Sequence, residues 1–338
     1  MPSDTAEAPV LEINDRCRYQ LCRKLADGGM GSVYEAILHG PEGFQKRVAV
    51  KTILAQYVSD SQFVEMFLGE AKLVADLVHQ NIVQIYQLGK FDGFYYMAME
   101  YIKGVNLQEL MRRQEILGRQ LPLDIGLFII SRVCRGLEYA HKKRDRTGKL
   151  LGVVHRDICP KNVMISSEGE VKITDFGIAK ARNLMEDREG EVLLGRVGYM
   201  SPEQFQYQPT DQRSDLYSLS VVMFELLTGA NLSSRWEQES VPGQRLRRTV
   251  PAPRSLNPAI PELLERIMIR GLEQDVSRRY QRAGELAYDL EYFLYHNGYR
   301  PTPKLLEQYL ITLFPNLEGP EEDEPEQAAP VQPPVGSD

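Results

Sequence analysis

The spacing of apolar residues divides the chain into a strand-rich first part and a helix-rich second part. From Tyr19 to Lys51, apolar stretches such as YQLCRKLADGGMGSVYEAIL and KRVAVKTIL are separated by glycine turns, which is typical of strands. Residues 82–102, IVQIYQLGKFDGFYYMAMEYI, predict two further strands around a Phe-Asp-Gly-Phe turn. Residues 61–78 predict a helix, because their apolar side chains recur every three or four positions.

Helical spacing dominates after Gly104. It predicts helices over residues 107–113, 124–142, 214–228, 261–272 and 283–296. Residues 163–177, VMISSEGEVKITDFG, predict a hairpin among them. We therefore expect an α+β protein of two lobes, with a boundary near residues 102–104 and a cleft between the lobes.

These patterns also predict the domain organisation. Residues 1–15 are polar and are expected to be flexible, 16–102 form the first lobe and 103–297 the second. Residues 298–317 form a helical extension, whose helix over 303–314 has an apolar stripe. We expect this helix to pack back on the helical lobe, and a docking or dimer surface is the second interpretation. The acidic, Pro-rich residues 318–338 are expected to be disordered.

Composition and charge indicate an ordinary globular protein with an acidic end. Of 338 residues, 43% are hydrophobic and 26% are charged, and the net charge is −7. Residues 318–338 contain seven acidic residues and no Lys or Arg, so the remainder of the chain is close to neutral. Because the acidity belongs to one segment, the charge gives no reason to expect nucleic acid as a partner.

Cysteine use and hydropathy favour a cytoplasmic protein. The four cysteines include no C-x-x-C pair and have no accompanying histidine cluster: Cys17, Cys22, Cys134 and Cys159. A disulfide framework or zinc site is therefore not expected, and a reducing compartment fits better. The first residues, MPSDTAEAPV, do not resemble a secretory signal, and no run of 18 apolar residues could span a membrane.

Two features of the first lobe suggest phosphate binding. The glycine-rich turn LADGGMGSV, residues 25–33, lets backbone N–H groups approach phosphate oxygens, although most such turns are only tight turns. Lys51 ends the apolar strand VAVK, and Glu70 lies within the apolar face of the helix over 61–78. Because each buried charge needs a partner, we expect Lys51 and Glu70 to pair, unless their side chains extend to water.

The second lobe contains an ordered set of polar motifs. HRDICPKN at 155–162 precedes DFG at 175–177, SPE at 201–203 and DLYSLSV at 215–221. Asp157, Asn162 and Asp175 supply a potential base and hard oxygen ligands of the kind that hold Mg²⁺ beside nucleotide phosphates. Any one of these motifs is common by chance, whereas the whole set in this order is not.

With these motifs the chain resembles the eukaryotic-like Ser/Thr protein kinases, most closely those of bacteria, from about Tyr19 to His296. The resemblance implies a bilobal kinase fold with a β-rich N-lobe and a helical C-lobe. It further implies Mg²⁺-dependent transfer of the ATP γ-phosphoryl group to Ser or Thr hydroxyls of protein substrates. Residues 198–203, GYMSPE, resemble the peptide-docking element of the family, and the oligomeric state is not predicted.

The resemblance also assigns roles to single residues. ATP binding falls to Leu25, Gly28, Gly29, Gly31, Val33, Ala49, Lys51, Met99, Glu100, Ile102 and Met164. In catalysis, Asp157 acts as the base, Lys51 pairs with Glu70, and Asn162 and Asp175 bind Mg²⁺. Glu203 is expected to pair with Arg279, and Asp215 to support the catalytic loop.

The chain departs from the family pattern at four places. Ala26 replaces the first glycine of the turn, which costs little if φ stays negative. Cys159 replaces the lysine that contacts the γ-phosphate, and we expect Lys161 to take over that contact; the alternative is a solvated loop lysine. Arg196 replaces a threonine. Ser and Thr are missing from the usual phosphorylation stretch, and Arg156 and Lys180 match positions that usually bind a phosphate there. An acidic residue of this loop could instead pair with Arg156, and the alternative is a solvated acidic loop: Glu186, Asp187, Glu189 and Glu191.

These departures leave three classes of protein to weigh. An active protein kinase is the leading interpretation, because Lys51, Glu70, Asp157, Asn162 and Asp175 are all present. A nucleotide-binding pseudokinase scaffold is the alternative, and a small-molecule kinase is disfavoured by the GYMSPE segment. A space-filling role for the Cys159 thiol is favoured over a redox role.

Overall fold

The computed structural model describes residues 12–27, 31–53, 61–176, 197–239 and 248–317; the side chains at 61–63, 66, 70, 73 and 237–239 lie outside the description. Within these limits the chain forms two compact units. The first comprises residues 12–76 and 84–102, and the second comprises residues 77–83 and 103–317. Among the described residues, no helix is both long enough and apolar enough to cross a membrane.

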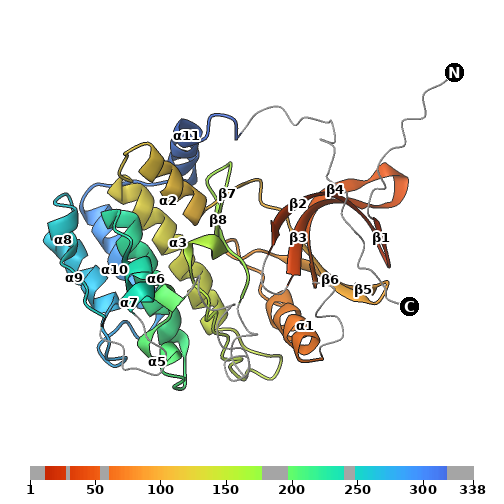
Figure 1. Cartoon of the computed structure of the whole chain (residues 1–338), viewed down its shortest axis with the longest axis horizontal. Helices are drawn as coiled ribbons and strands as arrows, with labels where there is room; N and C mark the ends of the chain where they lie inside the picture. The colour runs from red at the N-terminus through yellow and green to blue at the C-terminus, as the bar shows by residue number, and fades with distance from the viewer. Residues whose placement is uncertain (1–11, 28–30, 54–60, 177–196, 240–247, 318–338) are drawn as a thin grey trace. The chain divides into compact units, whose positions relative to one another are not determined.

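The first unit is a curled, six-stranded antiparallel sheet with one helix (Figure 1). The strands are β1 (Glu12–Asn14), β2 (Arg18–Asp27), β3 (Gly31–His39), β4 (Gln45–Ile53), β5 (Ile85–Phe91) and β6 (Phe94–Glu100), in the order β1-β2-β3-β4-β6-β5. Helix α1 (Ser61–Ala75) packs against β5. The strands predicted within residues 19–51 and 82–102, and the helix predicted over 61–78, are therefore present as β2–β6 and α1.

One face of this sheet encloses a small core. It is made of Ile13, Tyr19, Leu21, Tyr34, Ala36, Val48, Val50, Tyr96 and Ala98. Two buried tyrosines satisfy their hydroxyls in one chain of hydrogen bonds. Tyr19 donates to Gln87 (2.9 Å), Gln87 donates to the Tyr96 hydroxyl (2.9 Å), and Tyr96 donates to Asp15 (3.1 Å). Burial raises the pKa of both Tyr19 and Tyr96, which keeps these donors protonated.

Strand β1 differs from the flexible N-terminus expected over residues 1–15, at residues 12–14; residues 1–11 lie outside the described residues. Glu12–Asn14 pairs with β2, with Ile13 opposite Tyr19, and the Ile13 side chain is fully buried. The three-residue strand is too short to have a recognisable alternation of its own. It forms because the core offers Ile13 an apolar site and β2 offers it an unpaired edge.

The second unit is mainly helical. Its helices are α2 (Leu107–Ile116), α3 (Leu123–His141), α5 (Pro202–Phe205), α6 (Gln212–Thr228), α7 (Leu232–Glu239), α8 (Pro253–Leu256), α9 (Glu262–Gly271), α10 (Ala283–His296) and α11 (Pro303–Leu313). A three-stranded sheet in the order β7-β8-β9 accompanies them: β7 (Gly104–Asn106), β8 (Val163–Ser166) and β9 (Val171–Ile173). Within this unit, α6 lies between α3 and α9, and α10 packs on α3 (Figure 1).

Local sequence explains where the principal helices begin and end. Asn106 caps α2 by accepting from the Glu109 N–H (3.0 Å), while the Glu109 carboxylate accepts from the Asn106 N–H (2.8 Å). Asp211 caps α6, which ends at Gly229 with φ of 72°. Helix α6, which the apolar spacing predicts over residues 214–228, is buried along nearly its whole length and so has no broad polar face.

Helix α11 packs on the second unit as its apolar stripe predicts. Leu306, Leu310 and Leu313 are fully buried. Gln114 of α2 donates to the Tyr309 hydroxyl (2.9 Å), and Arg113 donates to the carbonyl oxygen of Leu313 (2.8 Å). The apolar face of this helix is therefore covered within the chain.

Candidate active site

In the first unit, one sheet face brings together several residues expected to bind ATP. The β3–β4–β6 register places Lys51 opposite Val33 and Met97, and Ala49 opposite Met99. Because side chains alternate along strands, these five residues share a face, opposite to the face that encloses the small core. Ala49 and Met99 are buried, while Lys51 and Val33 are half-buried.

The strands on either side of the glycine turn are held by a short hydrogen bond. Ser32 donates to Asp27 (2.6 Å), and this contact holds the pKa of the Asp27 carboxyl below its ordinary value. Ala26 pairs with Val33 in the extended strand and is not among the residues with positive φ, so its methyl group meets the condition under which it costs little.

Gly31 is buried, and a Cβ there would overlap the carbonyl oxygen of Thr52, so glycine is required for this close approach. Gly28 and Gly29 lie outside the described residues.

The remaining residues assigned to ATP in the first unit lie at strand ends. Leu25 of β2 is exposed, and Glu100 ends β6. The Glu100 N–H donates to the Gln84 carbonyl (2.8 Å), and its carboxylate accepts from the Gln84 N–H (3.2 Å). Ile102 is half-buried. The Glu70 side chain lies outside the description, so its pairing with Lys51 stays a prediction.

In the second unit, Asp215 holds the backbone of the segment 155–162, the catalytic loop. Its carboxylate accepts from the N–H groups of His155 (2.8 Å) and Arg156 (2.7 Å) and lies 2.8 Å from Nε2 of His141. Complete burial alone would raise the pKa of Asp215, but the hydrogen bonds to the carboxylate lower it below its ordinary value. The supporting role expected for Asp215 is thus visible as contacts.

His155 connects the catalytic loop to the segment after β9. Its Nδ1 accepts from the Asp157 N–H (3.2 Å), and its Nε2 lies 3.0 Å from the Thr174 carbonyl. Because a carbonyl can only accept, Nε2 is the protonated nitrogen of a neutral ring. Burial lowers the pKa of His155, in agreement with that neutral state. The ring also packs on Phe176, with centroids 4.5 Å apart.

Asp157 and Asn162 are in direct contact at the centre of this loop. Nδ2 of Asn162 donates to the Asp157 carbonyl (2.8 Å) and to its carboxylate Oδ2 (3.1 Å). Both residues are buried. With the amide nitrogen engaged in this way, the Asn162 side chain presents its oxygen as the group suited to a hard cation.

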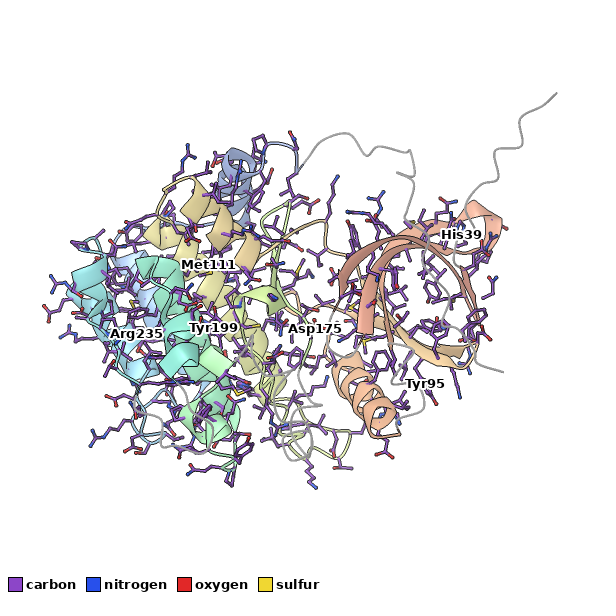
Figure 2. All side chains as sticks on the ribbon, in the orientation of Figure 1. His39, Tyr95, Met111, Asp175, Tyr199 and Arg235 are labelled. Atoms are coloured by element: carbon purple, nitrogen blue, oxygen red, sulfur yellow. The ribbon has the colours of Figure 1, made fainter. Side chains whose placement is uncertain are left out.

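Two non-glycine residues in this region have left-handed backbone conformations. Arg156 has φ of 64° and Asp175 has φ of 55°. Such conformations cost about 1 kcal/mol or more each and cluster at functional sites. Asp175, which Figure 2 labels, comes two residues after the end of β9. The Thr174 N–H donates to the Asn162 carbonyl (3.0 Å), which connects the two expected metal ligands through the backbone.

The replaced position and its expected substitute differ in exposure. The Cys159 side chain is buried, as a space-filling role requires. Lys161 is exposed, and its ammonium contacts no carboxylate in the part of the chain that the structure describes. Met164 of β8 is half-buried. These observations are compatible with the role expected for Lys161 and leave that role a prediction.

Residues 197–205 are anchored by side chains distant in sequence. Arg279 donates to both carboxylate oxygens of Glu203 (2.7 and 2.8 Å), so the pair expected from the sequence is confirmed. Burial alone would raise the pKa of Glu203, but the bonds from Arg279 lower it overall. Gln204 donates to the Arg156 carbonyl (3.0 Å), which connects this segment to the catalytic loop.

Several expected contacts fall on residues outside the description. These are Lys180, Glu186, Asp187, Glu189, Glu191 and Arg196. The acidic substitution for an activation-loop phosphate therefore stays a prediction. Arg156, the expected partner of that acidic residue, has a buried Nε without a hydrogen-bond partner among the described residues.

His141 and Gln204 also contribute to this site, although neither was predicted to do so from the sequence. His141 ends the amphipathic helix α3, and its contact with Asp215 joins residues 74 positions apart. Gln204 has one local signal, because it forms a capping box with Ser201 at the start of α5. Neither pattern reveals that the side chain reaches the catalytic loop.

The fold and these contacts define a class of protein, and comparison with known families agrees. Residues 19–286 match the model of the protein kinase domain, so the chain belongs to the protein kinase family. The curled sheet of the first unit and the helices of the second are its N-lobe and C-lobe.

Particular relatives are bacterial kinases. Tyrosine-protein kinase MasK of Myxococcus xanthus is 39% identical over 82% of this chain and 43% of its own length. Serine/threonine-protein kinase PrkC of Bacillus subtilis is 34% identical over 81% of this chain and 40% of its own length. The chain thus spans well under half the length of these curated relatives.

A solved structure shares the fold. The kinase domain of Mycobacterium tuberculosis PknI is similar with a TM-score of 0.60 and 26% identity, over 81% of this chain and 95% of that domain. The bilobal kinase architecture expected from the sequence is therefore confirmed.

Proposed function

We propose that this chain is an active protein kinase that transfers the γ-phosphoryl group of ATP to Ser or Thr hydroxyls of protein substrates. The observation that supports this most strongly is the contact of Asn162 with Asp157 on a loop whose backbone is held by Asp215. Maintaining a buried carboxylate in this arrangement is costly unless it has a use.

Asp157 is proposed to orient the acceptor hydroxyl and to take its proton. The Asn162 amide restrains the carboxylate, and His155 restrains the Asp157 backbone, so the base is held in place before substrate binds. Such positioning lowers the entropic part of the barrier to transfer.

Asn162 and Asp175 are proposed to hold Mg²⁺, and their amide and carboxylate oxygens fit that hard cation. When bound, Mg²⁺ neutralises charge on the nucleotide phosphates. In the N-lobe, Val33, Ala49 and Met99 are proposed to contact the adenine, and Lys51 the α- and β-phosphates. These assignments are supported by their shared sheet face.

Lys161 is proposed to contact the γ-phosphate in place of the residue replaced by Cys159. The exposure of Lys161 and the burial of Cys159 support this assignment. An ammonium is a compact, mobile charge that suits a phosphate, whereas a buried thiol offers neither charge nor reach.

Tyrosine is a second candidate acceptor. It is favoured by the 39% identity to a kinase named for tyrosine and by the basic residue at position 161, where tyrosine kinases often carry arginine. Ser and Thr stay preferred because GYMSPE is typical of the Ser/Thr class and because several further relatives are named serine/threonine kinases.

The test is autophosphorylation and peptide phosphorylation with Mg²⁺·ATP, followed by phosphoamino-acid analysis. We expect phosphoserine or phosphothreonine from the wild type and a loss of about 10³-fold or more in Asp157→Asn. Phosphotyrosine alone would select the second candidate. Nucleotide binding without transfer in the wild type would instead support the pseudokinase scaffold.

Three further proposals concern the partners, the domain bounds and the compartment. Protein substrates are the proposed partners. The helical lobe is proposed to run from residue 103 to 297, with residues 298–317 as its helical extension. The cytoplasm is the proposed compartment, supported by four described cysteines that form no disulfide with one another.

A further inference from the structure

Arg248, between α7 and α8, is a buried cation that the proposed reaction does not use. It is 4% exposed, and no carboxylate among the described residues pairs with it. The other deeply buried arginine, Arg279, is matched by Glu203. Because an unmatched buried charge is costly, the contacts of Arg248 need an explanation.

The guanidinium holds two backbone carbonyls of one turn. Nη1 donates to the carbonyl of Met200, and Nη2 donates to the carbonyl of Val197 at 2.9 Å. These carbonyls mark the first residue of the turn Val197–Tyr199 and the residue that follows it. A planar guanidinium has a rigid set of donors, so two bonds from one group fix the carbonyls relative to each other.

Arg248 is itself held by aromatic rings. Its Cζ lies 4.7 Å from the ring centroid of Trp236 and 5.9 Å from that of Tyr217. Its carbonyl accepts from Gln274 (2.8 Å), and its Nε has no hydrogen-bond partner in the described part of the chain. The rings stabilise the charge where a carboxylate would ordinarily do so.

The same turn is restrained on other sides. The hydroxyl of Tyr199, which is labelled in Figure 2, donates to Glu225 of α6 (2.6 Å). Glu225 also accepts from the Ser233 N–H of α7 (2.6 Å). A Cβ on Gly198 would overlap the Ser233 backbone. Of these restraints, the two bonds from Arg248 are the ones that hold backbone carbonyls, those of Val197 and Met200.

We propose that Arg248 is a positioning residue that shapes residues 197–200 as the backbone surface that receives the acceptor segment of a protein substrate. The inference rests on the proposed kinase function and on the resemblance of GYMSPE to a peptide-docking element. Trp236 is the only tryptophan of the chain and lies against Arg248, so its fluorescence reports on this site.

The test compares Arg248→Met and Arg248→Lys with Arg266→Met as the matched control. Arg266 is an exposed arginine of α9 whose ion pair with Glu262 is also exposed. In Arg248→Met we expect the peptide KM to rise about tenfold, or about 1.4 kcal/mol, with kcat and the ATP KM within about twofold of wild type. Arg248→Lys retains the charge but not the paired donors, so its peptide KM should be about threefold above that of the wild type.

Two further measurements separate positioning from a general loss of structure. The amides of residues 197–201 should exchange hydrogen about tenfold faster in Arg248→Met than in Arg266→Met, with exchange in α3 unchanged. Adding peptide should change Trp236 emission in the wild type and not in Arg248→Met. If Arg248→Met does not fold, Arg248→Lys supplies the same comparisons.

The proposal would be overturned if the Arg248 variants left both the peptide KM and the hydrogen exchange of residues 197–201 unchanged. It would also be overturned if kcat fell and the KM values for peptide and ATP rose by the same factor. If the wild type transfers phosphate to no peptide, the kinase function fails instead. Hydrogen exchange at residues 197–201 then still decides whether Arg248 shapes this turn.

Discussion

Replacing Glu203 by glutamine removes the charge that matches Arg279 in the C-lobe. In the wild type both side chains are buried, and Arg279 also donates to the carbonyls of Glu273 (2.6 Å) and Gln274 (3.1 Å). Glu203 accepts in addition from Ser214 (2.7 Å). Glutamine preserves the shape and one acceptor, so Glu203→Gln tests chiefly the loss of charge.

The expected magnitude follows from these contacts. Breaking a buried pair costs about 3–5 kcal/mol, because one charge is left without its partner. We expect about 3 kcal/mol for Glu203→Gln, in which the two carbonyls still support Arg279. Arg279→Met should cost about 5 kcal/mol, since it leaves both those carbonyls and the Glu203 carboxylate without their donor.

Thermal unfolding measures the difference. An unfolding entropy of about 2.1 cal/mol/K per residue, over roughly 220 residues of the second unit, gives about 0.46 kcal/mol/K. The Tm should therefore fall by about 6 °C in Glu203→Gln and by about 11 °C in Arg279→Met.

The double variant Glu203→Leu, Arg279→Met completes the cycle. Because it leaves no unmatched charge, its loss should be smaller than the sum of the Glu203→Leu and Arg279→Met losses by about 2–3 kcal/mol. A shift below about 1 °C in Glu203→Gln, or strict additivity in the cycle, would show that the pair does not stabilise the C-lobe in this way.

Three further predictions concern the catalytic loop and the α11 contact. Lys161→Ala should lower phosphotransfer by about tenfold or more while Lys161→Arg retains most of it; equal, near-wild-type rates in both would refute the assignment. Burial lowers the pKa of His155, so the unfolded state takes up a proton first as the pH falls below about 6.5. The unfolding free energy should then decline by at most about 1.4 kcal/mol per pH unit from this group, measured by urea unfolding, and an identical slope in His155→Phe would exclude it. Gly169 and Gly148 both have positive φ, but only at Gly169 would a Cβ overlap the Pro303 backbone. Gly148→Ala should cost about 1–2 kcal/mol, and Gly169→Ala clearly more; equal losses would contradict this contact with α11.

The principal helices and strands were predictable because their signals are local. The helix predicted over 283–296 matches α10, and the helix predicted over 124–142 differs from α3 by one residue at each end. Strand β7 and helices α5, α7 and α8 were not predicted. They are three to eight residues long, too short for a periodic pattern to stand out.

The site was predictable to the extent that its motifs are contiguous. HRDICPKN places Asp157 five residues before Asn162, and the structure joins their side chains. The bond from His155 to the Thr174 carbonyl depends instead on how two loops pack. The pairing of Lys51 with Glu70 was predicted from the sequence, and it stays a prediction because the Glu70 side chain is not described.

By itself the sequence determined which chemistry is available and where the regular elements lie. Periodicity, caps and motif spacing are properties of neighbouring residues, so they can be recognised before folding is considered. The tertiary structure alone decided that Ile13 adds a strand to the sheet and that Arg248 donates to the carbonyls of Met200 and Val197, 48 and 51 residues earlier. Those contacts depend on burial and on unmatched backbone groups that appear only when distant segments meet, which no local pattern encodes.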